Sequence, residues 1–231
     1  MDLITVDFET YYDKDFSLSK ITTEEYIRDP RFQVIGVGVK VNNGTTEWAS
    51  GTKAQIGDFL RSFNWEEAMF LAHNTMFDAA IANWVFGINP RVLADTLCIA
   101  RAVDGVEVGG SLGVLAERYS LGTKGTEVLD ALGKRRLDFT PEELSRYGDY
   151  CINDVNLTYD LFKVLAPNFP REELKLIDLS LRMFVEPTLD LDLGLLEQHL
   201  IETRDHKDKL LEKAGADKKD LMSNIKFAAL L

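Results

Sequence analysis

The opening segment carries two carboxylates, Asp7 and Glu9, at the end of an apolar, β-branched stretch that begins at Leu3. This composition predicts a buried strand, and residues at positions i and i+2 of a strand project from the same face. Two adjacent carboxylates raise each other's pKa and destabilise a fold unless a cation neutralises them. Because hard oxygen ligands suit Mg²⁺ or Mn²⁺, the pair predicts a metal site. The alternative is an exposed strand end with two solvated acids.

Two further acids lie in settings that fit the same site. Asp78 falls in the first turn of a helix predicted over 76–86, although the helix dipole alone favours an acid there. Asn74 is the expected N-cap of that helix. Tyr150 and Asp154 are four residues apart in a predicted helix, so the phenol and the carboxylate share one face. Each of these patterns is weak alone, because similar spacings occur by chance in many helices.

Together, these acids and their flanking sequences resemble the DEDDy class of 3′–5′ exonucleases, most closely the proofreading domain of phage-type family A DNA polymerases. The resemblance spans residues 1 to about 168 and rests on DFET at 7–10, HNTMFD at 73–78 and YCINDV at 150–155. It continues in the tail, where 183–187 and 221–231 are similar to the lead-in of a polymerase thumb. The resemblance therefore implies a fragment or a truncated relative of such a polymerase.

The resemblance implies a role for each acid and for the tyrosine. Asp7 would bridge two divalent cations, Mg²⁺ or Mn²⁺, in a two-metal hydrolysis of a phosphodiester. Glu9 and Asp154 would complete the shell of the first cation. Asp78 would hold the second cation through water, and Tyr150 would orient the attacking water.

The resemblance also indicates residues that would contact the substrate. Thr10, Asn74 and Phe77 match positions that line the 3′-terminal nucleotide. The side chain that separates strands in many relatives has no obvious counterpart in residues 11–19. Phosphate contacts are best assigned to four basic side chains, for which a solvated basic loop is the alternative reading. These side chains are Lys124, Lys134, Arg135 and Arg136.

Composition limits the kinds of partner that the chain can bind alone. A net charge of −12 over 231 residues argues against binding of nucleic acid through a basic surface. Bound cations, or other parts of a larger protein such as a polymerase module, must then mediate binding to single-stranded DNA 3′ ends. Cys98 and Cys151 form neither a Cys-x-x-Cys motif nor a disulfide framework. With no signal peptide or membrane-spanning stretch, we expect a cytoplasmic location, the host bacterial cytoplasm if the protein is phage-encoded.

A sheet with helices on both sides must position these residues. The segment 11–31 reads as polar and Tyr-rich, and 120–137 as a surface loop or short helix. Three strands in a meander followed by strand–helix alternation imply a mixed sheet. The resemblance makes this an α/β, ribonuclease H-like mixed five-stranded sheet flanked by helices, with a C-terminal helical extension. Strands are expected at 3–8, 32–41, 45–49, 68–72 and 91–95, and helices at 53–63, 76–86, 96–103, 111–119, 141–165 and 193–213.

Two domains are expected, a 3′–5′ exonuclease domain at 1–170 and a helical extension at 171–231 that resembles the start of a truncated polymerase thumb. The extension is too short to build its own core, so it must pack on another surface. The leading functional hypothesis is a metal-dependent 3′–5′ exonuclease that hydrolyses DNA to nucleoside 5′-monophosphates, as the proofreading part of a DNA polymerase. The alternatives are an exoribonuclease of the ribonuclease D type and an inactive nucleic-acid-binding scaffold. All four acids are present, which argues against the scaffold.

Overall fold

The fold is described from a computed structural model that covers residues 1–125 and 131–230. The chain divides into two compact units, Met1–Pro187 and Thr188–Leu231, each of which is described by itself. No helix in the described ranges combines the length and the apolar composition needed to cross a membrane.

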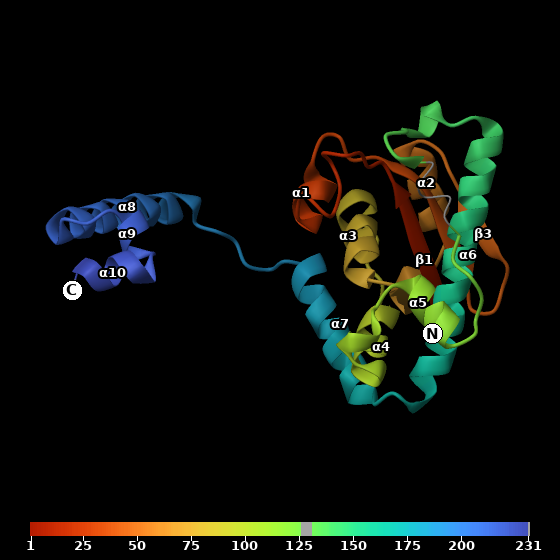
Figure 1. The fold of residues 1–231 in the computed structure, drawn as a ribbon. Helices are drawn as coiled ribbons and strands as arrows, with labels where there is room; N and C mark the ends of the chain where they lie inside the picture. Colours follow the sequence, from red (N-terminus) through yellow and green to blue (C-terminus); the bar gives the residue numbers. More distant parts are fainter. Residues whose placement is uncertain (126–130, 231) are drawn as a thin grey trace. The chain divides into compact units, whose positions relative to one another are not determined.

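The first unit is built on a mixed five-stranded sheet with the order β3-β2-β1-β4-β5 (Figure 1). β1 pairs antiparallel with β2 and parallel with β4, while β3 and β5 extend the sheet on either side. This arrangement confirms the predicted mixed sheet. The strands are β1 (Asp2–Thr10), β2 (Val34–Val41), β3 (Thr46–Ala49), β4 (Ala68–Ala72) and β5 (Val92–Asp95).

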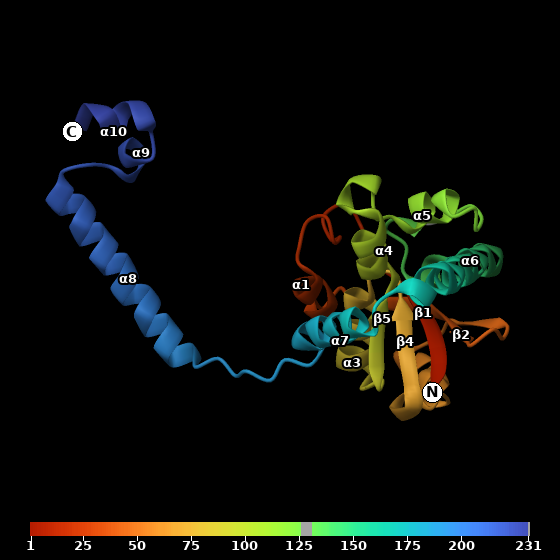
Figure 2. The same ribbon diagram turned by 90° about the horizontal axis from the view of Figure 1, so that it is seen from below.

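Helices cover both faces of this sheet, as predicted. Phe8 of β1 stacks on Phe86 of α3, whereas the neighbouring Asp7 contacts Cys151 of α6. Because adjacent strand residues point to opposite faces, α3 and α6 lie on opposite sides of β1 (Figures 1 and 2). The helices of the unit are α1 (Thr23–Arg28), α2 (Lys53–Arg61), α3 (Thr75–Phe86), α4 (Thr96–Asp104), α5 (Leu112–Arg118), α6 (Pro141–Leu165) and α7 (Arg171–Val185), with 3₁₀ turns at Trp65–Glu67, Val106–Val108, Arg136–Asp138 and Ala166–Asn168.

Local capping chemistry sets the ends of the two helices that carry site residues. The Thr140 side chain accepts from the backbone N–H of Glu143, whose carboxylate accepts from the backbone N–H of Thr140, so a capping box begins α6. Helix α3 ends at Gly87, whose φ of 70° lies in the left-handed region that glycine adopts without strain. Both ends agree with the sequence prediction.

The segment 11–31, which the sequence analysis described as polar and Tyr-rich without assigning an element to it, contains one short helix. Helix α1 occupies Thr23–Arg28 and begins with a capping box between Thr22 and Glu25. It buries Tyr26 and Ile27 in the core of the first unit. The sequence contains the Thr-x-x-Glu signature of this helix. A six-residue helix is too short to show a clear apolar periodicity.

The first compact unit extends beyond the domain boundary that was expected at residue 170. Helix α7 packs on α3 and β5. It buries Leu181 and Val185, and the backbone carbonyl of Val185 accepts a hydrogen bond from the indole of Trp84. Because this apolar face of α7 completes the first core, the unit ends at Pro187.

The second unit consists of helices without a deep core among their described side chains. Helix α8 (Leu193–Ala214) contains no buried residue, and α9 (Lys218–Leu221) contains none either. Helix α10 spans Asn224–Leu230. Leu196, Leu200 and Ile201 of α8 are about half exposed or more.

Candidate active site

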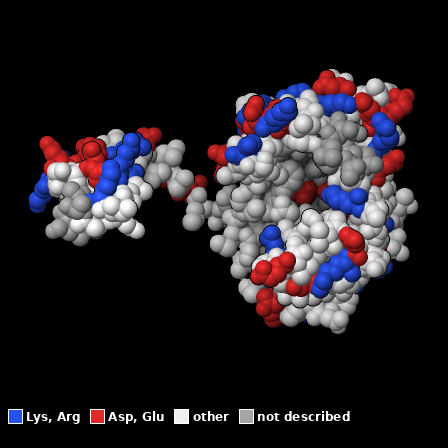
Figure 3. Space-filling model, in the orientation of Figure 1, with Lys and Arg blue, Asp and Glu red and all other residues white. Residues whose placement is uncertain are grey.

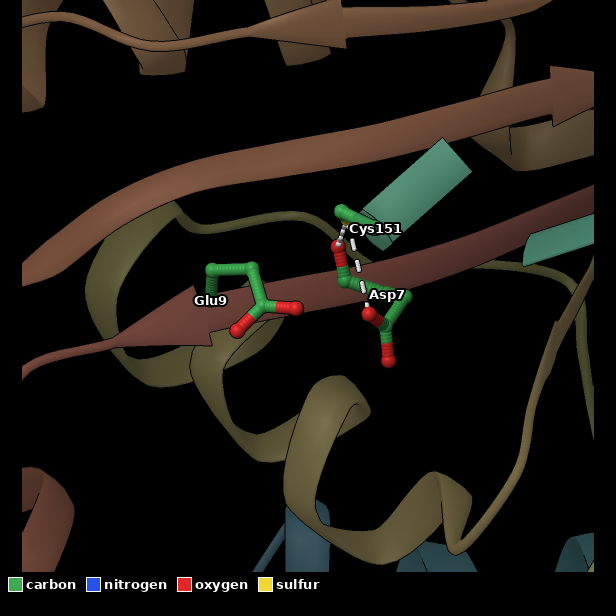
Figure 4. A group of neighbouring side chains, drawn as sticks. All are labelled: Asp7, Glu9 and Cys151. Atoms are coloured by element: carbon green, nitrogen blue, oxygen red, sulfur yellow. Dashed lines mark hydrogen bonds between the residues drawn. The ribbon is translucent and has the colours of Figure 1, made fainter. Parts of the chain in front are cut away.

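Strand β1 places Asp7 and Glu9 on the face of the sheet that α6 covers (Figure 4). Their register partners on β2 are Gly38 and Gly36, and the pairing shifts between Glu9 and Thr10. A bulge at this point ends the regular ladder just after the second acid, which is a common device beside functional sites.

Helix α6 supplies the opposing wall from a single helical face. Tyr147, Tyr150, Cys151 and Asp154 follow the spacing i, i+3, i+4 and i+7, and all four are buried. The Cys151 Sγ lies 3.4 Å from the backbone carbonyl oxygen of Asp7 and 3.5 Å from its carboxylate.

A glycine on β2 allows α6 to approach the sheet this closely. A Cβ at Gly38 would lie 2.9 Å from the Sγ of Cys151 and 2.9 Å from a methyl group of Val155. Any side chain at this position would push α6 away from β1 and separate Asp7 from Asp154. The glycine therefore sets the spacing between the two walls of the site.

Helix α3 brings in the remaining acid. Asp78 is 4% exposed, and its Oδ1 accepts a hydrogen bond of 3.0 Å from the backbone N–H of Phe8. Phe8 lies between Asp7 and Glu9, so this bond fixes Asp78 against the strand at the acid pair. The structure therefore brings together all four acids that the sequence singled out.

Each of these acids has a raised pKa. Burial raises the pKa of Asp7 to about 6, and repulsion from Asp154 adds to the shift. Burial, followed by repulsion from Asp7, raises the pKa of Glu9 and of Asp78 well above their usual values. Burial also raises the pKa of Asp154, although Lys124 opposes that rise. The four side chains form one electrostatic unit whose negative charge favours a bound cation.

The donor atoms of this cluster fit a hard divalent cation. Asp7, Glu9 and Cys151 each offer one ligand atom, and these atoms lie within 4.8 Å of one another. Asp154 Oδ1 is buried and has no hydrogen-bond partner among the described residues. Burial and the neighbouring Asp7 raise the pKa of the Cys151 thiol, so it stays protonated beside the carboxylates. The available ligands are therefore carboxylate oxygens, which Mg²⁺ and Mn²⁺ prefer.

A cavity of about 440 Å³ opens beside the acids. Figure 3 shows acidic and basic side chains meeting in a hollow of the first unit. A cavity of this size is within the range of small-ligand sites, so it has room for a terminal nucleotide. It is lined by Asp7, His73, Asn74, Leu97, Arg101, Gly110, Ser111, Leu112, Lys124 and Asp154.

The three residues predicted to contact the substrate lie in different settings. Asn74 is exposed at the cavity in a left-handed conformation, with a φ of 72°, and it occupies the N-cap position without a side-chain capping bond. Thr10 is buried and hydrogen-bonds Tyr26. The Tyr26 hydroxyl donates its proton to the Tyr11 carbonyl, so the Thr10 hydroxyl is the donor to Tyr26. Phe77 also packs against Tyr26, with a centroid distance of 6.0 Å. Of the three, the structure brings Asn74 to the cavity.

The four basic side chains that were candidates for phosphate contacts also lie in different places. Lys124 reaches the acids, and its Nζ lies 2.5 Å from Asp154 Oδ2. Lys134 pairs with Glu143 at 2.8 Å. The Arg135 side chain donates to a backbone carbonyl and covers the ring of Tyr11, while Arg136 belongs to a 3₁₀ turn. Residues 126–130 of the predicted loop lie outside the described part of the chain.

Tyr147 and Arg101 are among the site residues that were not found from the sequence. Tyr147 hydrogen-bonds Glu9, which partly offsets the rise of the Glu9 pKa that burial causes, and its ring stacks on Tyr150 at 6.2 Å. Its position three residues before Tyr150 on the same helical face was the available signal. Arg101 lines the cavity from α4. No local pattern indicated that α4 forms a wall of the site.

Comparison with known proteins supports the fold and the family. NrnC from Brucella melitensis shares 14% identity over 79% of this chain and 81% of that chain, with a TM-score of 0.56. RNase D from Trypanosoma brucei in complex with RNA U12 shares 13% identity over 82% of this chain and 65% of that chain, with a TM-score of 0.62. A family B DNA polymerase from Pyrobaculum calidifontis shares 17% identity over 72% of this chain and 25% of that chain, with a TM-score of 0.53.

At these identities the likeness concerns the fold, and it confirms the predicted ribonuclease H-like class. Among curated proteins, no sequence matches this chain. Residues 22–169 match a family model described as 3′–5′ exonuclease, and this match covers more than half of the 231 residues. The chain therefore belongs to the 3′–5′ exonuclease family.

Proposed function

We propose that this chain is a metal-dependent 3′–5′ exonuclease that hydrolyses DNA from the 3′ end and releases nucleoside 5′-monophosphates. The observation that carries the proposal is the convergence of four acids from β1, α3 and α6 beside a cavity, of which Asp7 is half-buried and the other three are buried. Burial of like charges is costly, so such a cluster persists in a fold when its negative charge serves a purpose. Holding divalent cations at a phosphodiester is the purpose that fits both the ligand set and the family.

The acids would divide between two metal positions. Asp7, Glu9 and Asp154 would hold one Mg²⁺ or Mn²⁺, and Asp7 with Asp78 would hold a second. When bound, the two cations supply an activated water and charge stabilisation for an in-line displacement at phosphorus. The protein's part is to keep these carboxylates in position through the Phe8 backbone bond and the α6 face.

Tyr150 would position the attacking water and would not act as a base. Burial and the nearby Asp154 raise the pKa of Tyr150 above its ordinary value of 10.0. A phenol with such a pKa keeps its proton at neutral pH, so it can donate a hydrogen bond but cannot remove a proton from water. Asn74 and Arg101 line the cavity and would contact the sugar and the phosphate of the terminal nucleotide.

We also propose that the site serves proofreading in a DNA polymerase, because the helical extension resembles the start of a polymerase thumb. An exoribonuclease of the ribonuclease D type is the second candidate. It is favoured by the fold shared with the Trypanosoma brucei RNase D, which was solved in complex with RNA.

The test is degradation of 5′-labelled DNA and RNA strands of one sequence, each with and without Mg²⁺. We expect a ladder that shortens from the 3′ end of DNA, that requires Mg²⁺, and that Asp7→Ala abolishes. Asp2→Ala, which removes an exposed acid from the same strand, is the matched control. Preferred degradation of RNA would establish the second candidate. Activity that resists a chelator, or that survives Asp7→Ala, would overturn the metal-dependent assignment.

A further inference from the structure

Lys124 occupies an unusual position for a lysine on a chain of net charge −12. It follows α5, yet its Nζ reaches across the cavity to within 2.5 Å of Asp154 Oδ2 on α6. The Lys124 ammonium also lies 5.3 Å from the centre of the Tyr150 ring. Its side chain is 33% exposed, whereas that of Asp154 is 4% exposed. The lysine thus reaches from the cavity to a buried carboxylate.

The contact leaves Asp154 only half satisfied. Oδ2 accepts from Lys124, while the buried Oδ1 has no hydrogen-bond partner among the described residues. The positive charge of Lys124 also reaches Asp7 and Glu9, where it opposes the larger effects of burial and mutual repulsion on their pKa. Lys124 therefore acts as a cation for three of the four acids, Asp7, Glu9 and Asp154.

We propose that Lys124 is a built-in counter-ion of the acidic cluster, which a divalent cation displaces from Asp154 and which then becomes a phosphate contact. This inference rests on the proposed function in one respect, since it takes Asp154 as a metal ligand. A carboxylate oxygen that holds an ammonium at 2.5 Å cannot also hold a divalent cation without placing two cations in contact. The metal and the lysine must therefore alternate at Oδ2.

The displaced lysine stays at the place where a substrate phosphate would arrive. Its flexible four-carbon stem lets the ammonium turn from the α6 wall into the cavity that it already lines. Lysine ammonium groups are common phosphate partners. Metal occupancy would thus free a phosphate-binding group, and the two binding events would favour each other.

A second lysine, which pairs with another carboxylate of α6, provides a matched control. Lys134 pairs with Glu143 at 2.8 Å and lies 5.5 Å from the centre of the Phe139 ring, so its contacts parallel those of Lys124. It does not line the cavity. Lys124→Met and Lys134→Met therefore remove the same charge from two similar pairs, of which one involves a proposed metal ligand.

The test is a Mn²⁺ titration by calorimetry on wild type and on both variants, combined with thermal unfolding without metal and at saturating Mn²⁺. We expect Lys124→Met to bind Mn²⁺ about tenfold more tightly, because a competing charge is gone. It should melt below wild type without metal and match wild type at saturating Mn²⁺. Lys134→Met should leave Mn²⁺ affinity unchanged and lower the melting temperature equally under both conditions.

A measurement on the wild-type protein avoids any folding defect in the variants. Brief labelling of lysine amines with acetic anhydride, followed by mass spectrometry, should show that Mg²⁺ increases labelling of Lys124 relative to Lys134. Unchanged Mn²⁺ affinity in Lys124→Met, a stability deficit that persists in Mn²⁺, or labelling that Mg²⁺ does not change would each overturn the inference. If the wild type still degrades DNA, the proposed function stands. A wild type that neither binds Mn²⁺ nor degrades nucleic acid would overturn both.

Discussion

Helix α6 carries two carboxylates that pair with lysines from the preceding chain, Glu143 in its first turn and Asp154 three turns later, and the two carboxylates differ in burial. In the Lys134–Glu143 pair both side chains are about a third exposed, and the hydrogen bond from Lys134 lowers the pKa of Glu143. In the Lys124–Asp154 pair the lysine is just as exposed, but the carboxylate is buried and its pKa is raised.

The difference shows that a lysine at hydrogen-bond distance does not by itself decide the charge of a carboxylate. Around Asp154, burial outweighs the attraction of Lys124. Around Glu143, solvent makes ionisation easy, and the carboxylate serves as half of a capping box. Glu143 therefore stabilises a helix end, whereas Asp154 belongs to an acidic cluster whose negative charge Lys124 does not fully neutralise.

The largest expected effect is the loss of nuclease activity on removing an acid of the buried cluster. Asp7→Ala, Glu9→Ala, Asp78→Ala and Asp154→Ala should each lower the rate by at least about a thousandfold, and Asp7→Ala/Glu9→Ala should be scarcely slower than either single variant. Glu143→Ala should stay near the wild-type rate, since its carboxylate caps a helix. Single-turnover degradation of a labelled oligonucleotide measures these rates. Equal losses in Asp154→Ala and Glu143→Ala would remove the functional distinction between the two pairs.

A smaller loss of activity is expected on changing Tyr150, whose phenol lies beside the Lys124–Asp154 pair. Tyr150→Phe should slow catalysis by roughly 10- to 1,000-fold, because the water loses an orienting hydrogen bond while the carboxylates remain. Mn²⁺ affinity should be nearly unchanged in this variant and clearly weaker in Asp154→Ala. The measurement is the single-turnover rate against pH and Mn²⁺ concentration. A phenylalanine variant that equals wild type would reduce Tyr150 to a packing residue.

The metal-free protein should lose stability as pH rises through the range in which the buried acids ionise. Folding raises the pKa of Asp7 from 3.8 to about 6, chiefly through burial, so the folded state binds this proton more tightly than the unfolded state. The stabilisation from this proton is fully present below about pH 4, and it is lost as the pH rises through about 6. Asp7→Asn removes this ionisation. Its melting temperature in a chelator should therefore increasingly exceed that of wild type from pH 5 to pH 8, and a constant difference would contradict the assignment.

For the exposed Lys134–Glu143 pair, stability should change with pH in the opposite direction, and the effect should be the smallest of the four. The pKa of Glu143 is lowered in the folded state, so its contribution to stability is present above the ordinary value of 4.5 and is lost as pH falls through the folded-state pKa. Glu143→Gln should lower the melting temperature at pH 7 by a few degrees at most, because exposed ion pairs contribute little. The deficit should shrink toward pH 3. A thermal melt series over this range measures it, and a deficit that grows in acid would show that the pair is not ionic.

The amino-acid sequence by itself determined the features that depend on near neighbours in the chain. The alternation of β1 placed Asp7 and Glu9 on one face, and helical spacing placed Tyr150 and Asp154 on one face. The capping box at Thr140 and the stop at Gly87 fixed helix ends. These features follow from backbone periodicity and local hydrogen bonds, which need no knowledge of distant residues.

Only the tertiary structure decided which distant groups meet at the site. Lys124 was one of four basic candidates in the sequence, and its pairing with Asp154 depends on how the chain after α5 lies against α6. The closeness of Cys151 to Asp7 depends on a glycine of β2, and the role of Arg101 as a cavity wall depends on the packing of α4. Such contacts join segments that no periodicity relates. They arise when apolar faces are buried against one another, and the polar groups beside those faces are carried into contact with them.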